Sequence, residues 1–485
     1  MIGILLNDTS YEQDIRELLM AFYPGETFAH EKQEDVTYYI EGTFNSENGT
    51  FTLKLIDNDA VAAESTFPLD YKNRLATKTV IKKELYNLCS ERTGKVLPWG
   101  TLTGIRPTKI ALTRLDEGWK EDDIKNFMRE TYLTSEEKID MSVEIAAREK
   151  ELLSKIDYEN GYSLYVGIPF CPTTCAYCSF TSYPIGLWKG KVHLYLEALF
   201  KELEYVAQKM KGRTLDTVYF GGGTPTSLSA DELDQLLTKI ENTFDLSTVK
   251  EYTVEAGRPD SITEDKLRTL RAHGITRISI NPQTMKQETL NIIGRLHTVE
   301  HVKEQFRLAR ELGFDNINMD LIVGLPEEDL ADVRQTMEEV KALAPDSVTV
   351  HSLAIKRAAK LNMFKEKYAN LKIENTQEMI DVTEEYSRAM GLVPYYLYRQ
   401  KNMAGNFENV GYAAPGKECI YNILIMEEKQ TIVACGAGTT TKVVFPKENR
   451  LERVENVKDV ALYIERIDEM IERKEKMLEK LDLVY

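Results

Sequence analysis

The stretch that decides the fold is Pro169-Phe170-Cys171-Pro172-Thr173-Thr174-Cys175-Ala176-Tyr177-Cys178. Three and two residues separate its cysteines, so one short loop can wrap three thiolates around a single inorganic cluster. A 4Fe–4S cluster has four iron sites. Three protein ligands leave one iron open to a small molecule, as in catalytic rather than structural metal sites. The sequence therefore predicts Cys171, Cys175 and Cys178 as cluster ligands, against the alternatives of an incomplete zinc loop and three unrelated thiols.

The composition excludes some classes of partner. The chain has 485 residues, enough for two or three domains, and a formal net charge of −17 without a long basic run. Because Lys and Arg supply most of the affinity for phosphates, we expect no nucleic-acid partner. No apolar run approaches the ~20 residues of a membrane span. The apolar start at 1–6 is too short for a signal peptide and lacks its basic flank.

The other cysteines indicate the compartment. Cys89, Cys419 and Cys435 are scattered along the chain and do not form a disulfide framework. This usage fits a reducing cytoplasm, and an oxygen-sensitive cluster points to the same place.

Three regions follow from the pattern of elements. Residues 1–155 are expected to form an α+β domain that ends in a charged helical connector at 121–153. Its other predicted elements are strands at 1–6, 36–44 and 50–56 and helices at 11–22 and 71–90. Residues 386–485 are expected to form a C-terminal α+β extension, with β-like segments at 394–400, 421–426 and 431–444 and a solvated charged helix at 460–480.

Between them, residues 156–385 alternate short β-rich runs with helical runs. The predicted strands are 163–168, 215–220, 251–255, 276–281, 316–323 and 347–351, and the predicted helices are 190–211, 229–243, 263–273, 286–312 and 329–343. Alternation of this kind implies a parallel sheet covered by helices. The α/β fold class that we expect is a partial, open (β/α)6 barrel.

The unusual residues gather at one rim of this barrel, where chemistry takes place in barrel folds. The cysteine loop follows the first strand, and later strands carry Gly221-Gly222-Gly223-Thr224-Pro225, Glu255, Gln283, Asp320 and His351 at or near their ends. This convergence is stronger evidence for an active site than any single motif.

In S-adenosylmethionine (SAM) radical enzymes, the open iron of such a cluster takes the amine and carboxylate of SAM. An electron from the cluster then cleaves the sulfonium to a 5′-deoxyadenosyl radical. The glycine run brings backbone close to a ligand. Its N–H groups are expected to hold the SAM carboxylate and its carbonyls the amine, unless the run is a plain tight turn. Glu255 is expected to accept hydrogen bonds from the ribose hydroxyls or the ammonium group, the alternative being a surface ion pair.

Several side chains need partners. Asp320 lies in an apolar strand, where an acid is costly unless paired, and Arg295 is the expected partner. His297 is expected to be a structural hydrogen bonder rather than a ligand. Tyr165 and Tyr177 are expected to flank the open iron, and core packing is the alternative for Tyr165.

Together these residues resemble the oxygen-independent coproporphyrinogen III oxidase family of radical SAM enzymes over residues 161–445. The matching motifs are Ile168-Pro169-Phe170-Cys171, Phe220-Gly221-Gly222-Gly223-Thr224-Pro225-Thr226, Arg277-Ile278-Ser279-Ile280, Gly294-Arg295-Leu296-His297 and Asp320-Leu321-Ile322-Val323-Gly324-Leu325-Pro326. Within the family the chain resembles the HemZ branch through Ile280-Asn281-Pro282-Gln283-Thr284-Met285, Tyr396-Leu397-Tyr398-Arg399-Gln400-Lys401-Asn402-Met403-Ala404-Gly405 and the stretch from Leu97 to Pro107.

The resemblance implies a set of cofactor contacts and a reaction. The implied SAM contacts are Tyr165, Tyr177, Gly222, Gly223, Thr224 and Glu255, and counterparts of Gln283, Arg295 and Asp320 hold a second SAM in the best-studied branch. The implied reaction is oxidative decarboxylation of two propionates of coproporphyrinogen III to vinyls, giving protoporphyrinogen IX in haem biosynthesis. It needs an electron donor such as flavodoxin or ferredoxin.

Two departures from the family keep alternatives open. Phe180 stands where the bacterial oxidase branch has a further cysteine. Tyr421-Asn422-Ile423-Leu424-Ile425-Met426 stands where haem-trafficking relatives carry His-Asn-x-x-Tyr-Trp, which argues against a haem-binding or transfer protein. A radical SAM enzyme for another tetrapyrrole or an RNA base is the third hypothesis.

A tetracarboxylate substrate needs cations. Lys356, Arg357, Arg399 and Lys401 are the candidates, and ordinary surface charge is the alternative. Arg106 and Lys109 in the N-terminal domain either meet substrate carboxylates or only pack against the barrel.

Overall fold

The computed structural model describes the chain except for residues 105, 357–358, 369, 401–406, 449 and 483–485. It divides into two compact units, Met1–Ala147 and Arg148–Tyr485. The sequence predicts a boundary at 155/156, whereas these units divide between Ala147 and Arg148. The segment 386–485 belongs to the second unit and does not form a unit of its own.

The first unit contains a five-stranded sheet in the order β2-β1-β3-β4-β5. Its strands are β1 (Ile2–Leu6), β2 (Phe28–Ala29), β3 (Tyr38–Asn45), β4 (Thr50–Asp57) and β5 (Ala60–Pro68). Helices α1 (Glu12–Phe22) and α2 (Arg74–Thr93) contribute Ile15, Leu18, Ile81 and Leu85 to a core shared with the sheet. β5 was not expected, because this edge strand is mostly exposed and lacks a buried alternating face.

A second, smaller core lies under three further helices. These are α3 (Thr108–Asp116), α4 (Glu121–Tyr132) and α5 (Glu136–Leu153). The single connector helix expected at 121–153 is wrong, because Leu133 adopts a left-handed conformation, with φ of 56°, that ends α4. Leu112, Met128 and Ile139 are fully or nearly fully buried between these helices.

The second unit is built on an eleven-stranded sheet in the order β14-β15-β13-β12-β11-β10-β9-β6-β16-β17-β18. Its six central strands are parallel: β6 (Tyr162–Ile168), β9 (Leu215–Gly222), β10 (Glu251–Gly257), β11 (Arg277–Ile280), β12 (Ile317–Val323) and β13 (Ser347–Ser352). They are buried along almost their whole length, as in parallel sheets covered on both faces. In the described part of the chain the sheet does not close on itself, so the expected partial barrel is confirmed.

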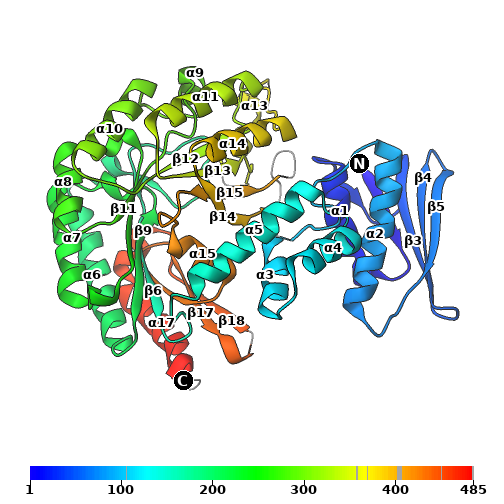
Figure 1. Cartoon of the computed structure of the whole chain (residues 1–485), viewed down its shortest axis with the longest axis horizontal. Coiled ribbons are helices and arrows are strands. Elements are labelled where there is room, and N and C mark those ends of the chain that lie inside the picture. The colour runs from blue at the N-terminus through cyan, green and yellow to red at the C-terminus, as the bar shows by residue number, and fades with distance from the viewer. Residues whose placement is uncertain (105, 357–358, 369, 401–406, 449, 483–485) are drawn as a thin grey trace. The chain divides into compact units, whose positions relative to one another are not determined.

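Helices form the outer layer of this barrel (Figure 1). They are α6 (Val192–Lys209), α7 (Ala230–Thr243), α8 (Glu264–Ala272), α9 (Gln287–Ile292), α10 (Val299–Glu311) and α11 (Leu330–Leu343). Capping boxes at Ser229/Glu232 and Asp329/Asp332 start α7 and α11 by satisfying their first N–H groups. The helix expected at 286–312 is two helices, because Gly294, with φ of 76°, ends α9 and Thr298 caps α10.

The C-terminal segment extends both edges of the sheet. β14 (Val393–Tyr398) and β15 (Asn409–Ala413) lie beyond β13, while β16 (Thr431–Cys435), β17 (Thr440–Phe445) and β18 (Arg450–Glu455) lie beyond β6. The remaining elements are β7 (Phe170–Cys171), β8 (Tyr183–Pro184), α12 (Lys360–Met363), α13 (Lys365–Tyr368), α14 (Gln377–Ala389), α15 (Ile420–Glu427), α16 (Val460–Glu465) and α17 (Ile467–Asp482). α16 and α17 divide the helix expected at 460–480 into two.

The β-like segment expected at 421–426 is wrong, because α15 occupies it. Periodicity does not distinguish a short buried helix from a buried strand. The Glu251 carboxylate accepts a 2.6 Å hydrogen bond from the Ile420 N–H and thereby caps the helix.

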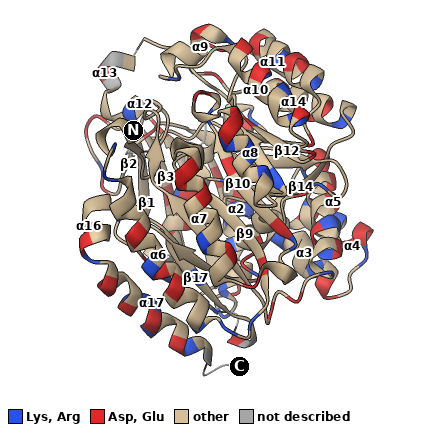
Figure 2. Cartoon of the chain, turned by 90° about the vertical axis from the view of Figure 1, so that its left-hand side faces the viewer, with Lys and Arg blue, Asp and Glu red and all other residues tan. Residues whose placement is uncertain are grey.

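The surface of the outer helices is mixed in charge. Acidic and basic residues alternate along α17, as expected for a solvated face (Figure 2). Among the described residues, no helix combines the length and the apolar character needed to cross a membrane.

Candidate active site

The cysteine loop leaves the end of β6 and is held on two sides. The Ala176 N–H donates a 2.9 Å hydrogen bond to the Ile293 carbonyl, just after α9. The Ala176 carbonyl accepts a 2.9 Å hydrogen bond from the Leu361 N–H in α12. These bonds fix the loop over the rim of the barrel, with Cys171 and Cys175 buried and Cys178 half-buried.

The three thiols share one environment. Burial, together with the neighbouring Cys175 and Cys171 thiols, raises the pKa of Cys178 to about 11, against an opposing hydrogen bond from the backbone of Phe180. Burial also raises the pKa of Cys171. Thiols must lose their protons to bind metal, so cluster binding here would release protons. Sulfur ligands are those of iron–sulfur clusters, and the donor set fits such a cluster. Among the described residues, no three His, Cys, Asp or Glu side chains lie close enough together to hold a single metal ion.

The glycine run packs against the start of the cysteine loop. The Gly223 N–H donates to the Ile168 carbonyl at 2.8 Å, and the Thr224 N–H donates to the Phe170 carbonyl at 2.7 Å. A Cβ on Gly223 would lie 2.5 Å from the Phe170 oxygen. Within the glycine run, the Gly223 N–H is therefore bonded to a protein carbonyl and is not free for the SAM carboxylate, contrary to the expectation for this residue.

Two neighbours of Gly223 have separate roles. Gly222 has φ of +107°, a conformation that favours glycine. The Thr224 hydroxyl lies 3.4 Å from the Cys171 sulfur, so Thr224 contacts a cluster ligand.

Glu255 lies near the end of β10, two residues before Gly257. Its Oε1 accepts a 2.6 Å hydrogen bond from the Tyr219 hydroxyl. Burial raises the pKa of Glu255 to about 7, with the Tyr219 hydrogen bond acting against this rise and the Asp320 charge adding to it. A Cβ on Gly221 would lie 3.2 Å from the Glu255 carboxyl and 3.0 Å from the Tyr165 hydroxyl, so this glycine leaves room for both side chains.

Three tyrosines form a stack across the sheet. The Tyr165 and Tyr219 rings lie 6.0 Å apart and are 13° from parallel, and these residues are register partners on β6 and β9. Tyr421 from α15 stacks on Tyr219 at 4.3 Å. Tyr165 thus packs in a core stack, the alternative that the sequence left open, and it lies beside Glu255 at the same time.

Arg295 serves the cysteine loop. Its Nη2 donates a 3.1 Å hydrogen bond to the Tyr177 hydroxyl, its Nη1 donates to the Asn281 carbonyl, and its charge lies near the Cys175 thiol. The expected pair between Arg295 and Asp320 is therefore wrong. Arg295 is drawn to the thiols because its loop follows α9, next to the Ala176 anchor.

Asp320 has other partners. Its Oδ1 accepts a 2.7 Å hydrogen bond from the Asn318 amide, and its Oδ2 lies 4.0 Å from His351 Nε2. Burial lowers the pKa of His351, and the Asp320 charge opposes that change.

Gln283 is buried and has a strained backbone conformation. It has φ of +68°, which costs about 1–3 kcal/mol for a residue with a Cβ. Its N–H donates a 3.0 Å hydrogen bond to the Asp320 carbonyl. Among the described residues, its side-chain Oε1 is buried without a hydrogen-bond partner. Gln283 and Asp320 therefore lie together, while Arg295 contacts Tyr177 in the cysteine loop.

Sequence reasoning missed Arg258 and Asp260. The Arg258 Nη1 donates to the Thr173 carbonyl at 2.7 Å, inside the cysteine loop, and Asp260 pairs with the same guanidinium at 2.6 Å. Both residues follow β10 directly. The expectation that functional residues lie at the C-terminal ends of barrel strands, which selected Glu255, could therefore have selected them too. His297 Nδ1 lies 3.8 Å from Asp260 Oδ1.

The candidate substrate cations differ in exposure. Lys356 is exposed, with its ammonium 5.8 Å from the centroid of the Phe180 ring. Arg399 is 4% exposed, and burial lowers its pKa to about 10. Arg357 and Lys401 lie outside the described residues, and Arg106 and Lys109 belong to the first unit.

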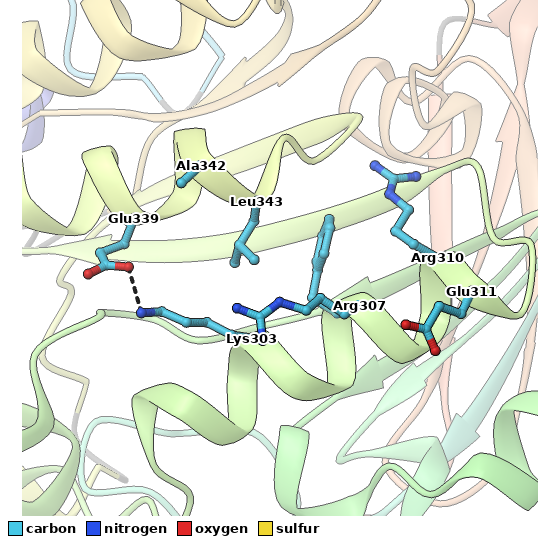
Figure 3. Close-up of a pocket in the computed structure, with 8 residues that line it drawn as sticks. Lys303, Arg307, Arg310, Glu311, Glu339, Ala342 and Leu343 are labelled. Atoms are coloured by element: carbon cyan, nitrogen blue, oxygen red, sulfur yellow. Dashed lines mark ion pairs between the residues drawn. The ribbon is translucent and has the colours of Figure 1, made fainter.

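A surface hollow of about 410 Å³ lies away from this site, between α10 and α11 (Figure 3). Lys303 and Glu339 pair within it at 2.8 Å, and Arg310 pairs with Asp346 at 2.6 Å. Its main charges are therefore neutralised locally, on the outer helix layer.

Comparison with known proteins agrees with this geometry. Residues 165–340 match the model of the radical SAM superfamily. The oxygen-independent coproporphyrinogen-III oxidase-like protein HemZ of Bacillus subtilis is 43% identical over 408 residues, covering 83% of this chain and 81% of that protein. The heme chaperone HemW of Bacillus subtilis is 31% identical over 301 residues, covering 60% of this chain and 76% of HemW.

A solved structure shows the same fold. Coproporphyrinogen III oxidase (HemN) from Escherichia coli superposes with a TM-score of 0.52 and 24% identity, covering 66% of this chain and 72% of HemN. Radical SAM proteins use a 4Fe–4S cluster and SAM, which the three cysteines and the residues around them fit. The chain belongs to the radical SAM superfamily, and within it to the oxygen-independent coproporphyrinogen III oxidase family and its HemZ branch.

Proposed function

We propose that this protein catalyses the oxygen-independent oxidative decarboxylation of coproporphyrinogen III to protoporphyrinogen IX, a step of haem biosynthesis. Each of two propionates would lose a hydrogen atom from its β-carbon to the radical. It would then lose carbon dioxide and one electron, which passes to a one-electron acceptor, and become a vinyl group. The observation that carries the proposal is the 43% identity over most of the chain to a coproporphyrinogen-III oxidase-like protein. The proposal includes a reducing cytoplasmic setting and an electron donor such as flavodoxin or ferredoxin.

The residues at the rim would divide the work. When bound, the cluster and SAM supply the electron and the carbon-centred radical that abstracts hydrogen. Cys171, Cys175 and Cys178 would hold the cluster. Glu255, in its ionised form, would accept hydrogen bonds from the ribose hydroxyls or the ammonium group of SAM. Arg295 keeps Tyr177 in place beside the cluster ligands through its 3.1 Å hydrogen bond.

Other residues would shield the reaction and bind the substrate. The stack of Tyr165, Tyr219 and Tyr421 fills the sheet face next to Glu255 and keeps bulk water out. Gln283 offers its buried Oε1 as an acceptor, next to Asp320, for a second SAM or for the substrate. Lys356 and Arg399 are the described candidates for binding substrate carboxylates.

A haem-transfer protein is the second candidate, because HemW is also a relative. Tyr421 disfavours it. This residue stands where those relatives place a histidine, its ring is stacked on Tyr219, and burial raises its pKa well above the ordinary value. A neutral, buried phenol is a poor ligand for haem iron.

One experiment separates the candidates. The reconstituted protein is given SAM and a reductant anaerobically, with coproporphyrinogen III, a second tetrapyrrole or haem in parallel. The proposal would be supported if coproporphyrinogen III, and neither of the other two ligands, gave vinyl products. Cleavage of SAM without decarboxylation would reject this substrate, and stoichiometric haem binding without any cleavage would favour the transfer protein.

A further inference from the structure

Arg258 is a buried cation that connects a carboxylate to the cysteine loop. Its side chain is only 3% exposed. On one side, Nε and Nη2 donate to the two Asp260 carboxylate oxygens at 2.9 and 2.6 Å. On the other side, Nη1 donates to the Thr173 carbonyl at 2.7 Å and to the Thr173 hydroxyl at 2.8 Å, and lies 3.8 Å from the Cys175 sulfur.

The pairing explains why the charge is tolerated. A buried guanidinium is costly unless it is paired and hydrogen-bonded, and the fork of Arg258 uses Asp260 for this purpose. Burial raises the pKa of Asp260, but the hydrogen-bonded Arg258 guanidinium and the nearby His297 outweigh burial and hold that pKa well below its usual range. Asp260 is therefore ionised at neutral pH, and the pair is a fixed dipole whose positive end faces Cys175.

This dipole acts on the group that the cysteines hold. Reduction adds one negative charge to a cluster, and hydrogen bonds to its sulfurs and nearby positive charge favour the reduced form. Arg295 is a second buried cation whose charge lies near Cys175. Arg258 differs from it in having an anionic partner, Asp260, which moderates its charge.

We propose that Arg258 is a positioning residue that holds the cysteine loop and raises the reduction potential of the cluster through Cys175, and that Asp260 limits this rise. The inference rests on the cluster of the proposed function and is independent of the substrate. It predicts effects of opposite sign, because Arg258→Gln removes a positive charge near the cluster and Asp260→Asn removes a negative one.

The test is the midpoint potential of the reconstituted cluster in the full chain, followed by electron paramagnetic resonance and accompanied by iron content. Arg258→Gln is expected to make reduction about tenfold less favourable, which is about 59 mV lower for a one-electron couple. Asp260→Asn is expected to raise the potential. Arg268→Gln is the matched control, because Arg268 is 63% exposed and pairs with Glu264 on α8. The cluster of this variant is expected to keep the wild-type midpoint potential.

The outcomes are distinct. Full iron content with an unchanged potential in Arg258→Gln would overturn the proposal. If Arg258→Gln takes up no iron, the test rests on Asp260→Asn. A raised midpoint potential in Asp260→Asn supports the proposal, and an unchanged or lowered midpoint potential overturns it. A wild-type chain that binds a cluster but makes no decarboxylated product rejects the proposed substrate and leaves this inference standing. A wild-type chain without a cluster overturns both.

Discussion

The Tyr219 hydroxyl donates a 2.6 Å hydrogen bond to Glu255 inside the barrel, and this bond holds the carboxylate closer to its ionised form. Burial raises the pKa of Glu255 to about 7, so near neutral pH the group exists in both protonation states. Both SAM binding and folding stability should therefore depend on pH near neutrality.

Binding of SAM is expected to strengthen as pH rises through about 7, because ionised Glu255 is the stronger hydrogen-bond acceptor for the ligand. Tyr219→Phe removes a bond that lowers this pKa, so the midpoint of the pH profile should move to higher pH. Glu255→Gln should bind about tenfold more weakly, with a flat profile. The measurement is the dissociation constant of SAM against pH, by anaerobic calorimetry.

Tyr252→Phe is the matched control for that series. Tyr252 lies on β10, and its hydroxyl is buried without a hydrogen-bond partner among the described residues. Its pH profile should be that of the wild-type protein. An equal shift in Tyr252→Phe and Tyr219→Phe would contradict the assigned role of the Tyr219 bond.

The same pKa predicts a pH dependence of stability. Glu255 binds its proton more tightly when folded, with a pKa of about 7 against 4.5 ordinarily, so its contribution is full below pH 4.5 and is lost as pH rises to 7. The loss amounts to about 3 kcal/mol. As pH rises from about 5 to 8, the free energy of unfolding of Glu255→Gln should therefore increase relative to that of the wild-type chain. Urea unfolding without cofactors measures both proteins. A constant difference across this range would exclude the effect.

Gly223→Ala is expected to displace the cysteine loop. The added Cβ would lie 2.5 Å from the Phe170 carbonyl oxygen, which is backbone and does not rotate away. Overpacking of this kind costs about 1–3 kcal/mol. The melting temperature and the iron content after reconstitution should both fall. Gly186→Ala, where nothing lies within 4 Å of the new Cβ, should change neither.

The tyrosine stack is expected to depend on rings rather than on the Tyr421 hydroxyl. Tyr421→Phe keeps the 4.3 Å stack on Tyr219 and should keep its stability. Tyr421→Ala opens a cavity in a buried cluster and should cost about 3–5 kcal/mol. Chemical denaturation measures both variants, and equal stability of the two would contradict the stacking role.

Much of the barrel could be predicted from the sequence, since buried parallel strands and capped helices leave strong local patterns. Elements set by tertiary context could not. Helix 420–427 depends on the Glu251 carboxylate, which is remote in sequence. The left-handed backbone at Leu133 left no residue signal, because glycine is the usual choice there.

The site followed the same division. Glu255, Gln283 and Asp320 could be selected because functional residues of barrels lie at the C-terminal ends of strands, and strand ends are visible in the sequence. The partners of side chains were harder, since they depend on how loops fold back. Asp320 accepts a hydrogen bond from Asn318 on its own strand and is not paired with Arg295. The Gly223 N–H donates to the Ile168 carbonyl of the neighbouring strand β6.

The central claim is that three cysteines hold a cluster that drives decarboxylation of coproporphyrinogen III. The most direct test measures 5′-deoxyadenosine and vinyl products together in anaerobic reactions of the wild-type protein, Cys175→Ala and Cys435→Ala, the last being a buried thiol outside the loop. We predict both products, in coupled amounts, from the wild-type protein and Cys435→Ala, and neither from Cys175→Ala. Vinyl products from Cys175→Ala, or deoxyadenosine without any vinyl product from the wild-type protein, would contradict the account.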